Sequence, residues 1–126
     1  MASLDHERVG HAVGTALSGP GGVGMVLRVF CGVPGVVSQP ARRGFWRSQA
    51  ERVQIGDWRY EVTADGRLSA AHLVRGIVLA EEVLAAGAVG PHIARALGQL
   101  VGSYGATIVP NIDAALDALD AGSGPR

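Results

Sequence analysis

Apolar and polar side chains alternate most clearly in the middle of the chain, on both sides of an Asp-Gly dipeptide. A two-residue turn at this dipeptide would mix apolar and polar side chains on each face of the hairpin. A three-residue loop at 64–66, closed by a left-handed glycine in a bulge, separates the two kinds of side chain much better. We therefore predict the second register, in which Val62 pairs with Leu68 and Trp58 pairs with His72.

This register gives the predicted hairpin one apolar face and one polar face. The apolar face comprises Trp58, Tyr60, Val62, Leu68, Ala70, His72 and Val74. The polar face comprises Arg59, Glu61, Thr63, Arg67, Ser69, Ala71, Leu73 and Arg75. We expect residues 52–55 and 77–83 to add one strand on either side. The sequence therefore predicts an antiparallel meander of about four strands over roughly residues 51–83.

Helical periodicity precedes this sheet. Residues 4–17 have apolar positions at helical spacing, with Ser3 as the expected N-cap and Gly19 as a stop. Residues 23–31 fit a helical stripe and also a strand alternation. We favour a helix there because Arg28 then lies away from the apolar stripe, and we expect the Gly- and Pro-bearing segment that follows to be a connector.

Two helices are predicted after the sheet. The first has Pro91 in its first position and ends at Gly105. Its apolar stripe consists of Ile93, Leu97, Leu100, Val101 and Tyr104. Residues 107–109 are predicted to be extended, Asn111 to cap the last helix, and residues 122–126 to form a frayed tail. The whole chain is thus predicted to be a single α+β domain, residues 1–126, with N-terminal and C-terminal helices packed on one face of the sheet.

Composition removes several classes of function. The formal net charge is zero, with 11 basic and 11 acidic residues, which argues against a chain that coats nucleic acid. Every basic residue is an arginine, so Schiff-base lysines and the P-loop lysine are excluded. The one cysteine, Cys31, excludes an intrachain disulfide and a Cys-rich metal site. Glycines, prolines and Arg28 interrupt the longest apolar stretch, so we expect no membrane span and a cytoplasmic protein.

Charge is distributed unevenly along the chain. Residues 42–59 hold five arginines and two acidic residues, a net charge of +3, whereas residues 81–120 hold one arginine and five acidic residues, a net charge of −4. Oppositely charged faces on a neutral chain suit self-association, which we rank above nucleic-acid binding. The candidate anion-binding or partner surface comprises Arg42, Arg43, Trp46, Arg47, Arg59, Arg67 and Arg75.

A second candidate site is a pocket between the sheet and the helices. It would be lined by Trp58, Tyr60, His72 and His92. Aromatic side chains beside a titratable histidine are typical of ligand sites, although a packed core histidine is the commoner arrangement. The glycines at 19–24 fit G-x-G-x-x-G but follow a predicted helix instead of a strand, so they predict no dinucleotide site. We assign no catalytic residue, no metal ligand and no cofactor.

Short blocks along nearly the whole chain resemble an uncharacterised family of small actinobacterial proteins. These blocks are Gly19-Pro20-Gly21-Gly22, Pro40-Ala41-Arg42-Arg43-Gly44, Gly56-Asp57-Trp58-Arg59-Tyr60-Glu61-Val62, Ala71-His72-Leu73-Val74, Val89-Gly90-Pro91-His92 and Pro110-Asn111. The resemblance implies a bacterial cytoplasmic protein with its own small domain type. That family has no assigned activity, so the resemblance assigns no catalytic residue.

The leading hypothesis for function is a non-enzymatic binding or interaction module that forms a homodimer, with a further protein partner as an option. Its contact surface would be the arginine and aromatic loop or the exposed face of the sheet, represented by Arg59, Glu61, Arg67, Leu73 and Arg75. The alternative is a small-molecule-binding protein or an enzyme that uses the pocket between sheet and helices.

Overall fold

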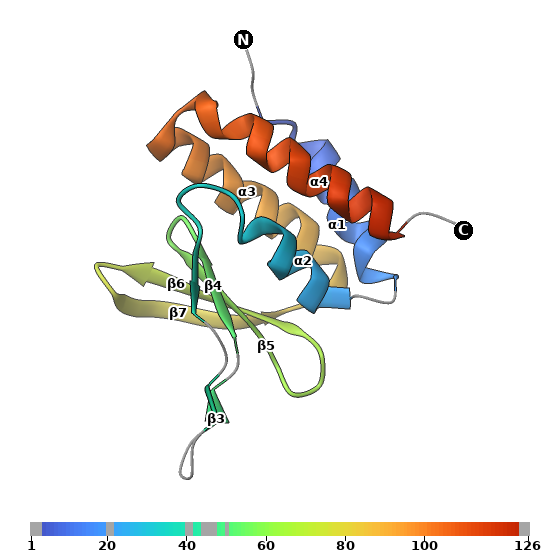
Figure 1. Ribbon diagram of the computed structural model, residues 1–126. Coiled ribbons are helices and arrows are strands. Elements are labelled where there is room, and N and C mark those ends of the chain that lie inside the picture. The colour runs from blue at the N-terminus through green and yellow to red at the C-terminus, as the bar shows by residue number, and fades with distance from the viewer. Residues whose placement is uncertain (1–3, 20–21, 40–41, 44–47, 50, 124–126) are drawn as a thin grey trace.

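The computed structural model describes residues 4–19, 22–39, 42–43, 48–49 and 51–123. Its helices lie on one face of an antiparallel sheet (Figure 1). The helices are α1 (His6–Leu17), α2 (Gly22–Phe30), α3 (Ala86–Tyr104) and α4 (Val109–Ser123), with the short 3-10 helix η1 (Ala106–Ile108) before α4. The strands are β1 (Val37–Gln39), β2 (Arg42–Arg43), β3 (Ser48–Gln49), β4 (Arg52–Ile55), β5 (Trp58–Val62), β6 (Leu68–Val74) and β7 (Ile77–Leu84).

Five strands form the main sheet, in the order β1-β4-β5-β6-β7. The predicted four-stranded meander is confirmed as β4 to β7. One strand of this main sheet was missed, because β1 lies in the segment predicted to be a connector and pairs along the free side of β4. It has three residues, which is too short for an alternation of side chains to be recognised. Among the described residues, β2 and β3 form a separate two-stranded sheet.

The predicted register of the central hairpin is confirmed. Val62 lies opposite Leu68, and Trp58 lies opposite His72. Gly66 has a φ of +83°, the left-handed conformation that the three-residue loop requires. The N–H of Thr63 donates to the carbonyl oxygen of Arg67 at 2.8 Å and closes the loop.

The end of β6 departs from the predicted faces. The register of β6 with β7 shifts between His72 and Leu73, where β7 carries one extra residue, Leu79, opposite β6. Beyond this shift Leu73, predicted on the polar face, is buried, whereas Val74, predicted on the apolar face, is 40% exposed. Ala71 of the predicted polar face is also buried.

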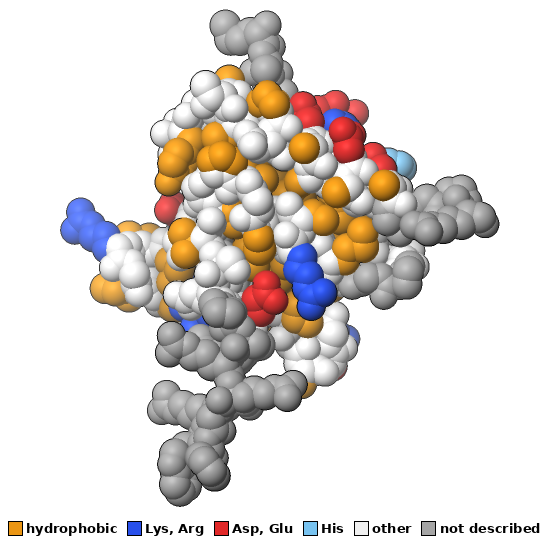
Figure 2. Space-filling model, viewed as in Figure 1, with side chains coloured by type: hydrophobic (Ala, Val, Ile, Leu, Met, Phe, Trp, Pro, Cys, Tyr) orange, Lys and Arg blue, Asp and Glu red, His pale blue; other side chains and the backbone are white. Residues whose placement is uncertain are grey.

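The helices form two tiers over the inner face of the sheet. Helices α2 and α3 contact strands β5 and β4, and α1 packs against α2, α3 and α4 (Figure 1). The helix favoured for residues 23–31 is therefore confirmed as α2. Helices α1 and α4 form the outer tier. Arg8 of α1 joins them by ion pairs to Asp113, at 3.3 Å, and to Asp117 of α4. Figure 2 shows the acidic side chains gathered over the helices, with a basic side chain among them.

Helix α1 begins two residues later than predicted. Its N-cap is Asp5, whose carboxylate accepts a hydrogen bond from the N–H of Arg8 at 3.1 Å. The predicted cap, Ser3, lies outside the described residues. Helix α3 begins at Ala86, so the prediction that Pro91 opens it was wrong. Pro91 lies inside α3, in its second turn, where its missing N–H removes the hydrogen bond to the carbonyl of residue 87.

The segment between the last two helices was also predicted incorrectly. Residues 107–109 are not extended, because η1 follows Gly105 directly and continues into α4. Asn111 therefore lies within the first turn of α4 and is not its cap. Pro110 fits there, since the first turn needs no N–H from it. Helix α4 continues to Ser123, so the predicted tail from residue 122 begins too early. Tyr104, predicted to lie on an inward stripe, is 56% exposed.

Among the described residues, none of the helices is both long and apolar enough to cross a membrane.

Candidate functional site

The four residues predicted to line a pocket lie together at the interface between the sheet and α3. Trp58 and His72 face each other across β5 and β6, and their rings stack at 4.7 Å between centroids with an interplanar angle of 20°. His92 of α3 meets Trp58 edge-on at 4.3 Å. The hydroxyl of Tyr60 lies 2.7 Å from Nδ1 of His92. We call these four residues the aromatic cluster.

The alternation of β5 and β6 explains three members of the aromatic cluster, since residues two apart on a strand share a face. Helix α3 supplies His92 because it crosses the inner face of the sheet. Tyr60 and His92 are buried, whereas Trp58 and His72 are half-buried. The cluster therefore has a closed inner pair and a partly open outer pair.

Protonation of the inner pair follows from its burial. Burial raises the pKa of the Tyr60 hydroxyl above its ordinary range, although the positive charge of Arg95 opposes this rise. Burial also lowers the pKa of His92, and Arg95 lowers it further, while the carboxylate of Glu82 acts in the opposite direction. Both groups are therefore neutral near pH 7. We infer that the Tyr60 hydroxyl donates a hydrogen bond to Nδ1 of His92, which places the ring proton of the neutral imidazole on Nε2.

The aromatic cluster offers two kinds of chemistry. A flat ligand could stack on the open Trp58–His72 pair, and the Tyr60–His92 hydrogen bond could relay a proton between the two side chains. Arg95 and Glu82 set its electrostatics. Arg95 was missed by sequence reasoning, although it lies three residues after His92 and so on the same side of α3. Within the described parts of the chain, no group of three or more His, Cys, Asp or Glu side chains is placed to hold a metal ion.

The structure describes three side chains of the predicted arginine surface, those of Arg59, Arg67 and Arg75. Arg67 and Arg75 flank the two ends of β6, whose seven residues span about 23 Å. Arg59 is half-buried in the middle of β5. Trp46 and Arg47 lie outside the described residues, and only the backbone of Arg42 and Arg43 is described. Leu73, proposed as an exposed contact residue, is buried.

Sequence reasoning predicted strand β7 but missed that it is an exposed, apolar edge of the sheet. It is the last strand of the sheet, and seven of its eight residues are exposed. The large apolar side chains among them are Ile77 at 64%, Val78 at 42%, Leu79 at 62% and Val83 at 51% exposed. Figure 2 shows apolar side chains on the projecting end of this hairpin, beside a basic side chain at its tip. Strand propensity predicted β7 correctly, but propensity carries no information about whether a strand lies at an edge.

Comparison with known proteins gives one match. The family described as "Domain of unknown function (DUF5073)" matches residues 1–121. The chain belongs to this family. The resemblance to an uncharacterised family is thereby confirmed. No curated protein and no solved structure matches the chain. Because the family description assigns no activity, functional arguments for this member rest on its own geometry.

Proposed function

We propose that this protein is a non-enzymatic interaction module that associates with a second copy of itself through strand β7. The observation that carries the proposal is an eight-residue edge strand with four exposed large apolar side chains. An edge strand presents unpaired N–H and C=O groups, and a long apolar edge is the kind of surface that pairs with another strand. The opposite edge, β1, is only three residues long.

The charges along the β6–β7 hairpin support antiparallel pairing of two copies. Arg75 lies at the tip of the hairpin, and Glu81 and Glu82 lie near the far end of β7. A two-fold axis across β7 would bring the Arg75 end of each copy toward the Glu81–Glu82 end of the other. Parallel pairing would instead align like charges. The complementary ends therefore favour a second copy as the occupant of this edge.

The edge supports self-association better than the polar face of the sheet does. On that face the charges are compensated within the chain, since Arg52 lies 3.8 Å from Glu61. Arg67, assigned to that face from the sequence, lies 3.5 Å from Asp65 and lines the helical side of the sheet instead. The acidic surface of α4 is partly neutralised by Arg8. Burial of apolar side chains supplies more binding free energy than exchange of already paired surface charges.

Sedimentation velocity over a range of concentrations tests the proposal with two matched variants. Leu79→Glu places a charge on β7, and Val37→Glu places the same charge on β1, where the side chain is 54% exposed compared with 62% for Leu79. We expect wild-type protein and Val37→Glu to form dimers. Leu79→Glu should dimerise at least about tenfold more weakly, because each interface would bury an unpaired carboxylate.

Circular dichroism spectra should be the same for all three proteins, because both substitutions are at exposed positions. A wild-type chain that remains monomeric at every concentration would refute the proposal. So would equal dimerisation of the Leu79→Glu and Val37→Glu variants.

The aromatic cluster supports a second candidate function, a small-molecule site on the open Trp58–His72 stack. Its supporting observation is the convergence of all four cluster residues. Native mass spectrometry of protein purified from its host should then show extra mass that is lost on denaturation. His72→Asn should keep the fold, because His72 is only half-buried, and should lose the extra mass. Loss of folding in this variant would instead assign His72 to the core.

A further inference from the structure

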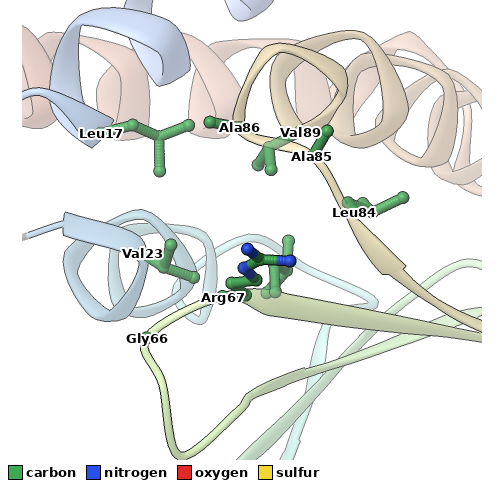
Figure 3. A pocket seen from close by; sticks show the side chains of 9 residues that line it. Leu17, Val23, Gly66, Arg67, Leu84, Ala85, Ala86 and Val89 are labelled. Atoms are coloured by element: carbon green, nitrogen blue, oxygen red, sulfur yellow. The ribbon is translucent and has the colours of Figure 1, made fainter.

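A cavity of about 390 Å³ lies between the helices and the place where β6 begins and β7 ends, away from the tip of their hairpin (Figure 3). Side chains from α1, α2, α3 and both strands contribute to its wall. The apolar lining includes Leu17, Val23, Leu68, Leu84 and Val89. Ligand sites have volumes of about 300–1,000 Å³, so this cavity fits a small ligand. Because its wall is mostly apolar, the part of a ligand that enters the cavity would be a hydrocarbon group.

Among the described residues that line this cavity, Arg67 carries the one charged side chain. Figure 3 shows its guanidinium group directed into the space between Val23 and Val89. The side chain is 67% exposed, which places it at the mouth. Its Nε lies 3.5 Å from Asp65, an exposed ion pair of low strength. Among the described residues, no hydrogen bond engages the two terminal nitrogens of Arg67, so both remain available to an anion.

The start of α3 adds positive potential on the same cavity. Ala85 and Ala86 line it, and they are the N-cap and first residue of this 19-residue helix. No side chain caps the helix, and its first turn has no acidic residue. The partial positive charge of a helix N-terminus therefore reinforces the charge of Arg67. The apolar cavity and Arg67 carry the inference, and the helix end contributes to it.

We infer that this cavity binds an aliphatic monocarboxylate, with its hydrocarbon chain among the apolar side chains and its carboxylate on Arg67. A planar guanidinium group matches a carboxylate through two parallel hydrogen bonds. A single arginine beside the carboxylate of Asp65 suits a singly charged anion better than a doubly charged phosphate monoester. Strand β7 contributes its last residue, the buried Leu84, to the wall, so a ligand here leaves the exposed residues 77–83 accessible for pairing.

Isothermal titration calorimetry with octanoate, and with octan-1-ol as the neutral analogue, tests this inference. Wild-type protein should bind octanoate more tightly than octan-1-ol. Arg67→Gln should weaken octanoate binding by about tenfold, the effect of losing one charge-assisted contact, and leave octan-1-ol binding unchanged. Arg28→Gln removes the same charge from an exposed position on α2 outside the cavity wall and should bind both ligands as wild type does.

A second variant tests the apolar part of the site. Ala86 is exposed and lines the cavity, so Ala86→Phe should fold normally, fill the opening and abolish binding of both ligands. The inference would be overturned by an absence of octanoate binding to wild-type protein. Equal octanoate affinity of the wild-type and Arg67→Gln proteins would overturn it as well, and so would unchanged binding by a folded Ala86→Phe variant.

Discussion

At the scale of single residues, the hydrogen bond between Tyr60 and His92 joins the sheet to the helical layer. Both side chains are buried, and each is the hydrogen-bond partner that the other would find in water if it were exposed. Since burial keeps both groups neutral, the bond avoids the cost of an enclosed charge. This contact therefore contributes to stability whether or not the aromatic cluster binds a ligand.

Tyr60→Phe should lower the free energy of unfolding by about 1–3 kcal/mol, because Nδ1 of His92 is then buried without its partner. Tyr104→Phe is the matched control, since Tyr104 is 56% exposed, and it should change stability by less than about 0.5 kcal/mol. Urea unfolding curves measure both variants. Equal effects of the two substitutions would show that the Tyr60 hydroxyl makes no net contribution.

Stability should also depend on pH through His92. Its pKa is lowered in the folded protein, so below its ordinary value of about 6.5 the unfolded chain binds a proton that the folded chain does not. The free energy of unfolding therefore falls as pH falls, by at most about 1.4 kcal/mol per pH unit. The stability difference between wild type and His92→Asn should shrink from about pH 7 to about pH 5. A constant difference would contradict the assigned neutral state.

Much of the aromatic cluster could be predicted from sequence, because strand alternation fixes which residues of β5 and β6 share a face. The same rule failed at Leu73 and Val74, at the end of β6 where its register with β7 shifts, because the pattern of one strand does not show how its neighbour pairs. The cavity at Arg67 could not be predicted either. Its wall comes from elements that are distant along the chain, and only their packing creates the space.

At the scale of elements, the type of each main helix and strand followed from periodicity, but several boundaries did not. Residues 86–90 are small and weakly patterned, so the predicted start of α3 fell at the later proline. Rules for helix ends locate sites where a cap is favourable, and tertiary contacts decide which of those sites is used. The edge position of β7 likewise depends on strand order, which the pattern of a single strand does not contain.

The crossing of α1 and α3 depends on two glycines that approach closely. A Cβ added to Gly90 would lie 2.8 Å from the carbonyl oxygen of Gly10, whereas a Cβ added to Gly10 meets nothing within 4 Å. Gly90→Ala should therefore lower the free energy of unfolding by about 1–3 kcal/mol. Gly10→Ala should raise it by up to about 1 kcal/mol, because alanine favours helix. Thermal unfolding measures both, and stabilisation by both variants would contradict the close helix crossing.

At the scale of the whole molecule, one face of the sheet is covered by helices and one edge is left apolar. The net charge is zero, so no overall repulsion opposes the approach of two copies. The charges that remain near the β7 edge are opposite at its two ends, which favours a two-fold arrangement. The proposed self-association through β7 would bury the apolar edge and bring these opposite charges together.

Amide hydrogen exchange of β7 at low and high protein concentration tests this central claim most directly. Alternate N–H groups of an edge strand face away from its sheet, and they exchange slowly only when a second strand accepts their hydrogen bonds. We predict that protection within residues 77–84 rises with concentration in the wild-type chain and stays low in Leu79→Glu, while α3 is unchanged in both. Exchange in β7 that does not depend on concentration would contradict pairing of this edge with a second copy.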